Sequence, residues 1–321
     1  EMTSSLVGSE MCIRDRNINA TKKAEKVEKI VFLQNNNCMR PVFLWMRIPR
    51  HRIECRHAVV SHQISPTMKA KNEKIFGLIG YPLGHSFSQT FFNRKFESEG
   101  INARYVNFEI PDIGDLMEVL AENPALAGLN VTIPYKQQIL PYLDDIDTVA
   151  QRIGAVNVVQ IVRGKSDNDF RLIGFNSDYA GFKMSIEPML KPNQKEALVL
   201  GTGGASRAVC CALEDLGVKP TLVSRTKREG VLTYAELTPE VMHTHNVIVN
   251  TTPLGMYPHV DSCPDIPYDL ITSDFLCYDL LYNPDVTLFM KRSAEHGAVV
   301  KNGLEMLLLQ AFESWEIWNA R

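Results

Sequence analysis

The residues best suited to chemistry form a glycine-rich turn, Gly201-Thr202-Gly203-Gly204-Ala205-Ser206-Arg207. The apolar run 197–200 before this turn predicts a buried strand, and residues 208–216 after it predict a helix that ends near Gly217. Glycines there let the backbone approach a phosphate, and the start of the helix offers unpaired N–H groups and a positive dipole end. This order of elements predicts a site for nucleotide phosphates, with a simple tight turn as the alternative.

The next predicted strand ends in a basic segment that indicates which dinucleotide the site takes. Residues 221–223 run into Ser224-Arg225-Thr226-Lys227-Arg228. A site for NAD usually places an acidic residue here to bind the ribose 2′-hydroxyl, and this segment has none. Three cations and two hydroxyls suit a 2′-phosphate instead, and Arg225 can bind it as a planar fork. We therefore predict NADP(H) as the cofactor, with a basic turn exposed to solvent as the alternative.

Polar residues gather at the ends of other predicted strands. Ser86 and Ser88 lie where a strand passes into a helix, and they suit either a ligand or the N-cap of that helix. Further hydroxyl, amide and charged side chains lie in the loops 130–136, 154–157 and 174–178. Because ligands of an open α/β sheet bind beyond the carboxyl ends of its strands, we predict that these loops line a second, polar site.

The elements that must position these loops alternate between strands and helices from residue 74 onward. Short links between alternating elements predict an α/β fold with a mainly parallel sheet and right-handed crossovers. The predicted strands cover 75–79, 104–110, 128–133, 197–200, 221–223, 247–249 and 276–279, with a β-rich stretch over 156–175. The predicted helices cover 88–99, 113–120, 179–189, 208–216 and 303–319.

Two later segments lead to more specific expectations. The helix over 303–319 carries apolar residues at a helical spacing, which predicts core packing. These residues are Leu304, Leu307, Leu308, Ala311, Phe312 and Trp315. The segment 226–246 is short for the helix and strand of a complete dinucleotide domain. We therefore expect a trimmed crossover that leaves the adenine side of the site more open.

Composition excludes several classes of protein. The chain has 321 residues, 45% of them hydrophobic, which is enough for two modest cores. Its apolar runs are far shorter than the ~20 residues of a membrane-spanning helix, which argues against a membrane partner. Seven cysteines are scattered without a C-x-x-C pair or a histidine at metal spacing. We therefore expect reduced thiols, a cytoplasmic protein and no metal site.

Residues 1–73 differ from the rest in charge and pattern. They carry 13 basic residues (Lys and Arg) and 7 acidic residues (Asp and Glu). The whole chain has 34 basic and 37 acidic residues, so residues 74–321 carry 21 basic and 30 acidic residues. The acidic body argues against a nucleic-acid partner. The first 73 residues lack sustained periodicity and fit secretory or transit peptides poorly, so we expect an unpatterned, disordered or non-native extension. Residues 4–16 resemble translated sequencing-adaptor sequence, and we expect the natural start at Met68.

Residues 74–321 resemble the shikimate dehydrogenase family in an ordered series of motifs. The glycine turn resembles the phosphate loop of that family, and Ser224-Arg225-Thr226 resembles the N-R-T that grips the 2′-phosphate. The other matching segments are 86–88, 130–136, 154–157, 174–178, 250–256, 279–284 and 302–310.

The resemblance implies an enzyme of two α/β domains. Residues 74–177 would bind substrate, residues 178–302 would form a Rossmann-type NADP-binding domain, and a helix over 303–321 would return to the substrate domain.

The implied reaction is the reversible reduction of 3-dehydroshikimate to shikimate by NADPH, on the route through chorismate to the aromatic amino acids. A hydride that arrives at a ketone leaves an alkoxide, which Lys136 can protonate while Asp178 orients it. Taken singly, Lys136 reads as a surface lysine and Asp178 as a helix start.

The resemblance also implies which residues bind the two small molecules. The substrate would contact Ser86, Ser88, Asn130, Thr132, Asn157, Tyr282 and Gln310. The cofactor would contact Gly201, Gly203, Gly204, Ala205, Ser224, Arg225, Thr226, Thr251, Met256 and Gly303. We expect the protein to be a monomer or a homodimer.

Some positions depart from the family pattern. Gln89 and Phe92 occupy places where the family usually has proline and histidine, and Ser177 replaces a threonine. Two alternative functions remain: a quinate/shikimate dehydrogenase paralogue, and a non-catalytic NADPH-binding protein on the same scaffold. The presence of both Lys136 and Asp178 argues against the second alternative.

Overall fold

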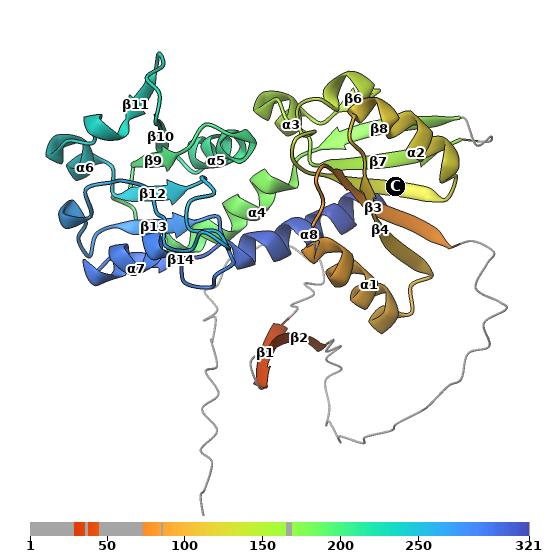
Figure 1. The fold of residues 1–321 in the computed structure, drawn as a ribbon, viewed down its shortest axis with the longest axis horizontal. Coiled ribbons are helices and arrows are strands. Elements are labelled where there is room, and N and C mark those ends of the chain that lie inside the picture. The colour runs from red at the N-terminus through yellow and green to blue at the C-terminus, as the bar shows by residue number, and fades with distance from the viewer. Residues whose placement is uncertain (1–28, 36–37, 45–72, 85, 165–168, 321) are drawn as a thin grey trace, which may run out of the picture. The chain divides into compact units, whose positions relative to one another are not determined.

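The computed structural model describes residues 29–35, 38–44, 73–84, 86–164 and 169–320. Its contacts divide the chain into a unit before residue 65 and a unit from Ser65 onward. The first unit contains an antiparallel hairpin of β1 (Lys29–Asn35) and β2 (Cys38–Leu44) (Figure 1). This hairpin differs from the expectation of an unpatterned extension, because such short apolar runs become strands only by pairing with each other. Segment 4–16 and Met68 lie outside the described residues.

The second unit begins with a mixed six-stranded sheet. The predicted parallel arrangement holds for three neighbouring strands, but β7 is antiparallel to both β5 and β8. Only six residues separate β7 from β8 in the chain, and a link this short joins antiparallel neighbours. The strand order is β4 (Ala103–Glu109), β3 (Lys74–Gly80), β5 (Leu126–Val131), β7 (Val158–Arg163), β8 (Phe170–Phe175) and β6 (Asp145–Ile146).

Helices cover both faces of this first sheet. They are α1 (Phe87–Glu99), α2 (Leu116–Glu122), which follows a 3-10 turn at Ile113–Asp115, and α3 (Thr148–Ile153), with a further 3-10 turn at Leu140–Tyr142. Helix α1 begins at Ser86, whose hydroxyl accepts the Gln89 N–H at 3.3 Å. The cap is therefore Ser86, and Ser88 lies inside the first turn. This removes the capping interpretation of Ser88.

The second sheet has six parallel strands in the order of a complete dinucleotide-binding domain. The expected trimming of the crossover was therefore only partly right. Residues 226–246 hold a three-residue strand, a 3-10 turn at Tyr234–Glu236 and helix α6 (Pro239–Thr244), because an edge strand and a helix this short need few residues. The order is β11 (Val231–Thr233), β10 (Lys219–Ser224), β9 (Glu196–Leu200), β12 (Val247–Asn250), β13 (Leu276–Asp279) and β14 (Val299–Lys301).

Both faces of the second sheet are buried. On one face Ala197 and Val199 pack against α4 (Ser177–Ile186) and α5 (Gly204–Asp215). On the other face Leu198 and Leu200 pack with residues of α6 and α7 (Leu288–Glu295). Two 3-10 turns, at Glu187–Met189 and Tyr268–Leu270, complete this part. Burial on both faces explains why the strands appear in the sequence as continuous apolar runs.

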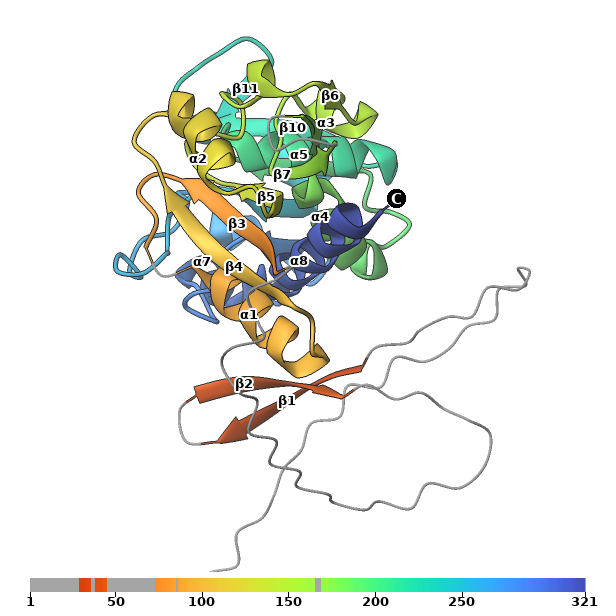
Figure 2. The ribbon, with the colours of Figure 1, turned by 90° about the vertical axis from the view of Figure 1, so that its right-hand side faces the viewer.

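Helix α8 (Leu304–Asn319) joins the two sheets (Figures 1 and 2). Near its start Met306 packs into the core of the second sheet, and near its end Trp318 stacks on Phe76 of the first sheet with ring centroids 4.8 Å apart. Because the two ends contact different sheets, the buried side of α8 is not one stripe. Of the predicted stripe, Leu308 and Ala311 are buried. The other members, Leu304, Leu307, Phe312 and Trp315, are half-buried.

Helices α4 and α8 lie side by side (Figure 2). A Cβ at Gly181 of α4 would lie 2.7 Å from the Met306 carbonyl oxygen and 2.8 Å from Gln310 Cγ, so only glycine allows this approach. A second contact joins α3 to α5, where Arg152 forms a bidentate ion pair with Asp215 at 3.0 and 2.6 Å. This ion pair lowers the pKa of Asp215 to about 2. These contacts connect the elements around the first sheet to those around the second.

No helix among the described residues is long and apolar enough to cross a bilayer. The four cysteines whose environments are described, Cys210, Cys211, Cys263 and Cys277, are free thiols.

Candidate active site

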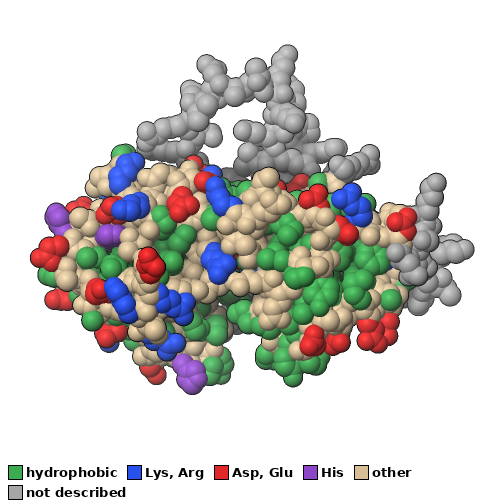
Figure 3. Space-filling model, turned by 90° about the horizontal axis from the view of Figure 1, so that it is seen from above, with side chains coloured by type: hydrophobic (Ala, Val, Ile, Leu, Met, Phe, Trp, Pro, Cys, Tyr) green, Lys and Arg blue, Asp and Glu red, His purple; other side chains and the backbone are tan. Residues whose placement is uncertain are grey.

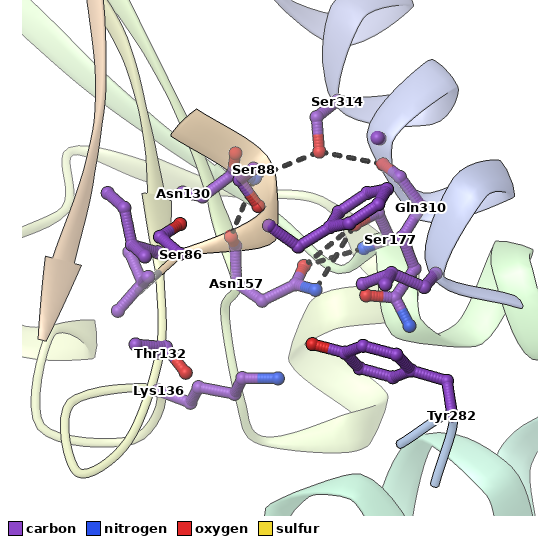
Figure 4. A pocket seen from close by; sticks show the side chains of 15 residues that line it. Ser86, Ser88, Asn130, Thr132, Lys136, Asn157, Ser177, Tyr282, Gln310 and Ser314 are labelled. Carbon is purple, nitrogen blue, oxygen red and sulfur yellow. Dashed lines mark hydrogen bonds between the residues drawn. The ribbon is translucent and has the colours of Figure 1, made fainter. Parts of the chain in front are cut away.

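A polar pocket of about 240 Å³ lies at the carboxyl ends of β3 and β5 (Figure 4). It brings together every predicted substrate residue and Lys136, although these come from widely separated parts of the chain. The predicted lining residues are Ser86, Ser88, Asn130, Thr132, Lys136, Asn157, Tyr282 and Gln310. Seven further lining residues were not predicted as contacts: Leu78, Phe87, Val131, Ser177, Leu307, Ala311 and Ser314.

The Lys136 ammonium is paired with a carboxylate at the pocket. Lys136 Nζ lies 2.5 Å from Asp178 Oδ2, and their side chains are 21% and 6% exposed. Asp178 lies in the first turn of α4, where the helix dipole favours a negative charge. The N-cap of that helix is Asn176, whose side chain accepts the Tyr179 N–H at 3.1 Å. Lys136 is therefore not a free surface lysine, and Asp178 is not needed as the cap.

Asn157 holds the start of α4 in place. Its Oδ1 accepts the Ser177 backbone N–H at 2.7 Å, and its Nδ2 donates to Ser177 Oγ at 3.1 Å. Both residues are buried and line the pocket. The pair therefore fixes the turn that carries Asp178, in addition to any contact that Asn157 makes with a ligand.

Residues from both sheets enclose the pocket. Tyr282 follows β13 of the second sheet, and its ring meets Phe87 of α1 edge to face, with centroids 6.3 Å apart. Sequence reasoning missed Phe87 because a phenylalanine in a helix is usually a core residue. It also missed Ser314, which lies one helical turn after Gln310 and therefore on the same face. That spacing was the available signal.

The glycine turn has the conformation that a phosphate site needs. Gly201 has φ +108°, and a Cβ there would lie 2.8 Å from Thr251 Oγ1, so only glycine fits. Helix α5 begins at Gly203 without a side-chain cap, which leaves the N–H groups of its first turn for an anion. A Cβ at Gly203 or Gly204 would meet no atom within 4 Å, so the space in front of the turn is open.

The segment after β10 is basic and exposed. Arg225 and Arg228 form no ion pair with any residue in the described ranges, whereas Lys227 pairs with Glu236 at 2.5 Å. This pairing lowers the pKa of Glu236 to about 2. Of the three cations predicted for a 2′-phosphate, Arg225 and Arg228 are thus without an ion-pair partner among the described residues, and Lys227 has one. Figure 3 shows the molecule from above, with most of the visible Lys and Arg side chains on the half that contains the second sheet.

The other predicted cofactor residues lie in different surroundings. Ala205 is in the first turn of α5, and Met256 is 47% exposed after β12. Thr251 donates its hydroxyl to the Leu200 carbonyl at 2.7 Å and so joins the end of β12 to the glycine turn. Gly303 is buried, and a Cβ there would lie 2.0 Å from the Leu280 carbonyl oxygen. Close backbone packing thus explains Gly303 without a ligand.

A buried carboxyl group supports the neighbouring loops. Asp279, at the end of β13, accepts hydrogen bonds from Asn250 Nδ2 at 3.0 Å and from the Thr287 hydroxyl at 2.6 Å. Burial raises the pKa of Asp279 to about 6. Asn250 in turn accepts the Thr252 N–H and hydroxyl. The ends of β12 and β13 are thereby tied together beside the pocket.

Comparison with known proteins identifies the family. Residues 78–159 match the family described as the shikimate dehydrogenase substrate binding domain. The shikimate dehydrogenase (NADP(+)) of Methanococcus aeolicus is 38% identical over 262 residues, covering 76% of this chain and 91% of the relative. The chain belongs to the shikimate dehydrogenase family.

Solved structures of the family share the fold. The shikimate dehydrogenase of Aquifex aeolicus is 36% identical, with a TM-score of 0.66 over 78% of this chain and 93% of that one. That of Thermus thermophilus, solved in complex with NADP(H) and shikimate, is 31% identical, with a TM-score of 0.66 over 77% and 93%. This chain is therefore a shikimate dehydrogenase family member with the two-sheet α/β fold expected from its sequence.

Proposed function

We propose that this protein catalyses the reversible NADPH-dependent reduction of 3-dehydroshikimate to shikimate. The observation that carries the proposal is the Lys136–Asp178 ion pair at a polar pocket lined by hydroxyls and amides. A polyhydroxy ring acid needs many hydrogen-bond partners and one positioned proton donor. This pocket supplies both.

The chain's own residues handle the proton. Bound NADP(H) supplies or accepts the hydride. As negative charge develops on the substrate oxygen, the Lys136 ammonium stabilises it and donates a proton. Asp178, 2.5 Å from Nζ, holds the ammonium in place. In the oxidation direction the neutral Lys136 amine accepts the proton from the substrate hydroxyl.

The remaining pocket residues bind the substrate. In this proposal Ser86 and Ser88, at the start of α1, bind the carboxylate, where the first-turn N–H groups and the helix dipole favour an anion. The amides and hydroxyls of Asn130, Thr132, Asn157 and Gln310 bind the ring hydroxyls, and Tyr282 closes the pocket from the second sheet. Residues 74–177 then form the substrate domain and residues 178–302 the cofactor domain.

The cofactor fits the second sheet. Its pyrophosphate would lie on the uncapped start of α5 at Gly203, and Arg225 would bind the 2′-phosphate beside Ser224 and Thr226. Thr251 and Met256 would border the nicotinamide end. We further propose a cytoplasmic protein that is a monomer or a homodimer.

A steady-state assay tests the function. Purified protein is mixed with NADP and either shikimate or quinate, and NADPH formation is followed by absorbance. We expect turnover with shikimate, and a larger kcat/KM for shikimate than for quinate. A larger kcat/KM for quinate would identify the quinate-using paralogue. Binding of NADPH without turnover of either acid would identify a non-catalytic binding protein.

A further inference from the structure

A buried tyrosine lies directly behind the pocket without lining it. Tyr105 is on β4, the edge strand of the first sheet, and is 2% exposed. Its ring stacks on Phe92 of α1, with centroids 4.9 Å apart and an interplanar angle of 12°. Its hydroxyl reaches over β3 and donates to Asn130 Oδ1 at 2.8 Å. Asn130 does line the pocket.

The hydrogen bonds around Asn130 have one order of donors and acceptors, in which each residue donates to the next from Tyr105 to Gln310. Burial raises the pKa of Tyr105 well above its usual value, so the phenol keeps its proton and acts as the donor to Asn130. The other end of the amide, Nδ2, donates to Ser314 Oγ at 2.9 Å, and Ser314 donates to the Gln310 carbonyl at 2.8 Å. A chain of hydrogen-bonded side chains thus connects β4, β5 and α8 beneath the pocket.

This order of donors and acceptors orients the Asn130 amide, with Oδ1 toward Tyr105 and Nδ2 toward Ser314. If the amide turned over, Oδ1 would meet the oxygen of Ser314, whose only proton is already donated to Gln310. Nδ2 would meet the Tyr105 hydroxyl, whose proton would then lack its acceptor. The Asn157 carbonyl oxygen, which accepts from Nδ2 at 3.4 Å, favours the same orientation. Removal of the Tyr105 hydroxyl removes one of these three constraints and leaves the ring packing intact.

We propose that Tyr105 is a positioning residue, which orients the Asn130 amide so that the pocket meets the substrate hydroxyls with a fixed pattern of donor and acceptor. The proposal rests on the proposed function, in which Asn130 contacts the substrate. Tyr105 itself touches neither the substrate nor the reacting atoms. Its effect is therefore on substrate affinity and not on the chemical step.

The variant Tyr105→Phe tests this proposal by deleting only the hydroxyl. We expect the KM for shikimate to rise about tenfold, the effect of losing one good hydrogen bond, while kcat stays within about threefold. The KM for NADP should not change. A kcat that falls as much as kcat/KM, with an unchanged KM for shikimate, would overturn the proposal.

Tyr278→Phe is the matched control. Tyr278 is also fully buried, and its hydroxyl lies 2.8 Å from Ser185 Oγ in the core of the second sheet, away from the pocket lining. It should lower the melting temperature about as much as Tyr105→Phe but leave the KM for shikimate unchanged. If the KM for shikimate rises equally in both variants, the cause is overall destabilisation of the fold by loss of a buried hydroxyl, and the proposal is overturned.

A double variant tests whether Tyr105 acts through Asn130. In an Asn130→Ala background, Tyr105→Phe should produce no further rise in KM, because the group that it orients is gone. A second tenfold rise in that background would overturn the proposal, since Tyr105 would then act by another route.

Side-chain amide NMR separates this proposal from the proposed function. Without substrate, the Asn130 amide resonances, assigned by their loss in Asn130→Ala, should exchange with solvent at least about tenfold faster in Tyr105→Phe than in the parent. If exchange is faster in Tyr105→Phe than in the parent, but the parent does not oxidise shikimate, the proposed function alone would be overturned. A parent that oxidises shikimate while exchange and KM are unchanged in Tyr105→Phe would overturn the role of Tyr105 alone.

Discussion

The Lys136 ammonium is held by one carboxylate and is only one-fifth exposed, which restricts it to a small region of the pocket. A long lysine side chain loses considerable rotamer freedom when it is fixed in this way. The Asp178 carboxylate, in the first turn of α4, offsets that cost. The group most suited to proton transfer is therefore already in position before any substrate arrives.

Lys136→Met should lower kcat by about 10²–10⁴-fold, the usual range for a positioned acid or base, while the KM for shikimate changes little. Methionine keeps the length of the stem and removes the charge. Lys183→Met, in the same helix as Asp178, is the control and should stay within about twofold, because the Lys183 ammonium contacts the hydroxyl and ring of Tyr179 and does not line the pocket. Steady-state kinetics measure both. A Lys136→Met enzyme within tenfold of the parent would rule out Lys136 as the acid.

Arg225→Ala should raise the KM for NADP by about tenfold to a hundredfold, since a charge-assisted hydrogen bond contributes about 1.5–3 kcal/mol. The kinetic constants with NAD, which lacks the 2′-phosphate, should hardly move. Lys227→Ala is the matched control, because Lys227 is already paired with Glu236, and its effect should be much smaller. Equal losses with NADP and NAD would show that Arg225 has a structural role instead.

At the scale of elements, the site depends on where strands end. The carboxyl ends of β12 and β13 are joined by the hydrogen bond from Asn250 to Asp279, and Thr287 of the next turn binds the second carboxylate oxygen. A fully buried carboxylate is costly unless it is hydrogen-bonded, and here it receives three donors. The loops that carry Thr251 and Tyr282 therefore begin from a rigid base.

The buried Asp279 carboxyl should make the free energy of unfolding depend on pH. The pKa of Asp279 is raised from 3.8 to about 6 in the folded protein, so its contribution to stability is complete below about pH 4 and is lost as the pH rises through 6. Asp279→Asn cannot ionise. Between pH 4 and 7 its free energy of unfolding should therefore gain up to about 3 kcal/mol relative to the parent. Denaturant titrations at several pH values measure this difference, and parallel curves would refute it.

At the scale of the whole molecule, the two sheets of the second unit are connected by α4, by α8 and by the Arg152–Asp215 ion pair. Met306 and Trp318 of one helix belong to different cores. A helix shared in this way couples the stability of the two cores. The pocket, which takes residues from both, should be complete only when both are folded.

Removal of residues 1–67 should leave this second unit folded and active. That segment is opposite in net charge to the rest of the chain, and the hairpin of β1 and β2 pairs within itself. We expect kcat and KM for shikimate to stay within about twofold, and the melting temperature to fall by less than about 4 °C, or roughly a kcal/mol. Calorimetry and the steady-state assay compare the two chains. A larger fall would show that residues 1–67 stabilise the enzyme.

Much of the fold was readable from local patterns. Buried parallel strands appear as apolar runs and some helices end at glycines, so the strands β3, β4, β5, β9, β10, β12 and β13 and the helices α1, α2, α4, α5 and α8 were predicted to within a few residues. The short elements β6, α3, β11, α6, α7 and β14 were not predicted. The antiparallel β7 was missed because strand direction depends on which neighbour pairs with it. The hairpin at 29–44 was missed because a short strand is defined by its partner and not by its own periodicity.

The sequence by itself determined which residue types are available for chemistry: the glycine turn, the basic segment without an acid, and a lysine and an aspartate in recognisable motifs. The tertiary structure decided which of them act together. It placed Lys136 against Asp178, paired Lys227 with Glu236, and set Tyr105 and Ser314 on either side of Asn130. These contacts join residues as far as 184 positions apart in the chain. Local propensity carries no information at that range, because such contacts depend on how strands and helices pack.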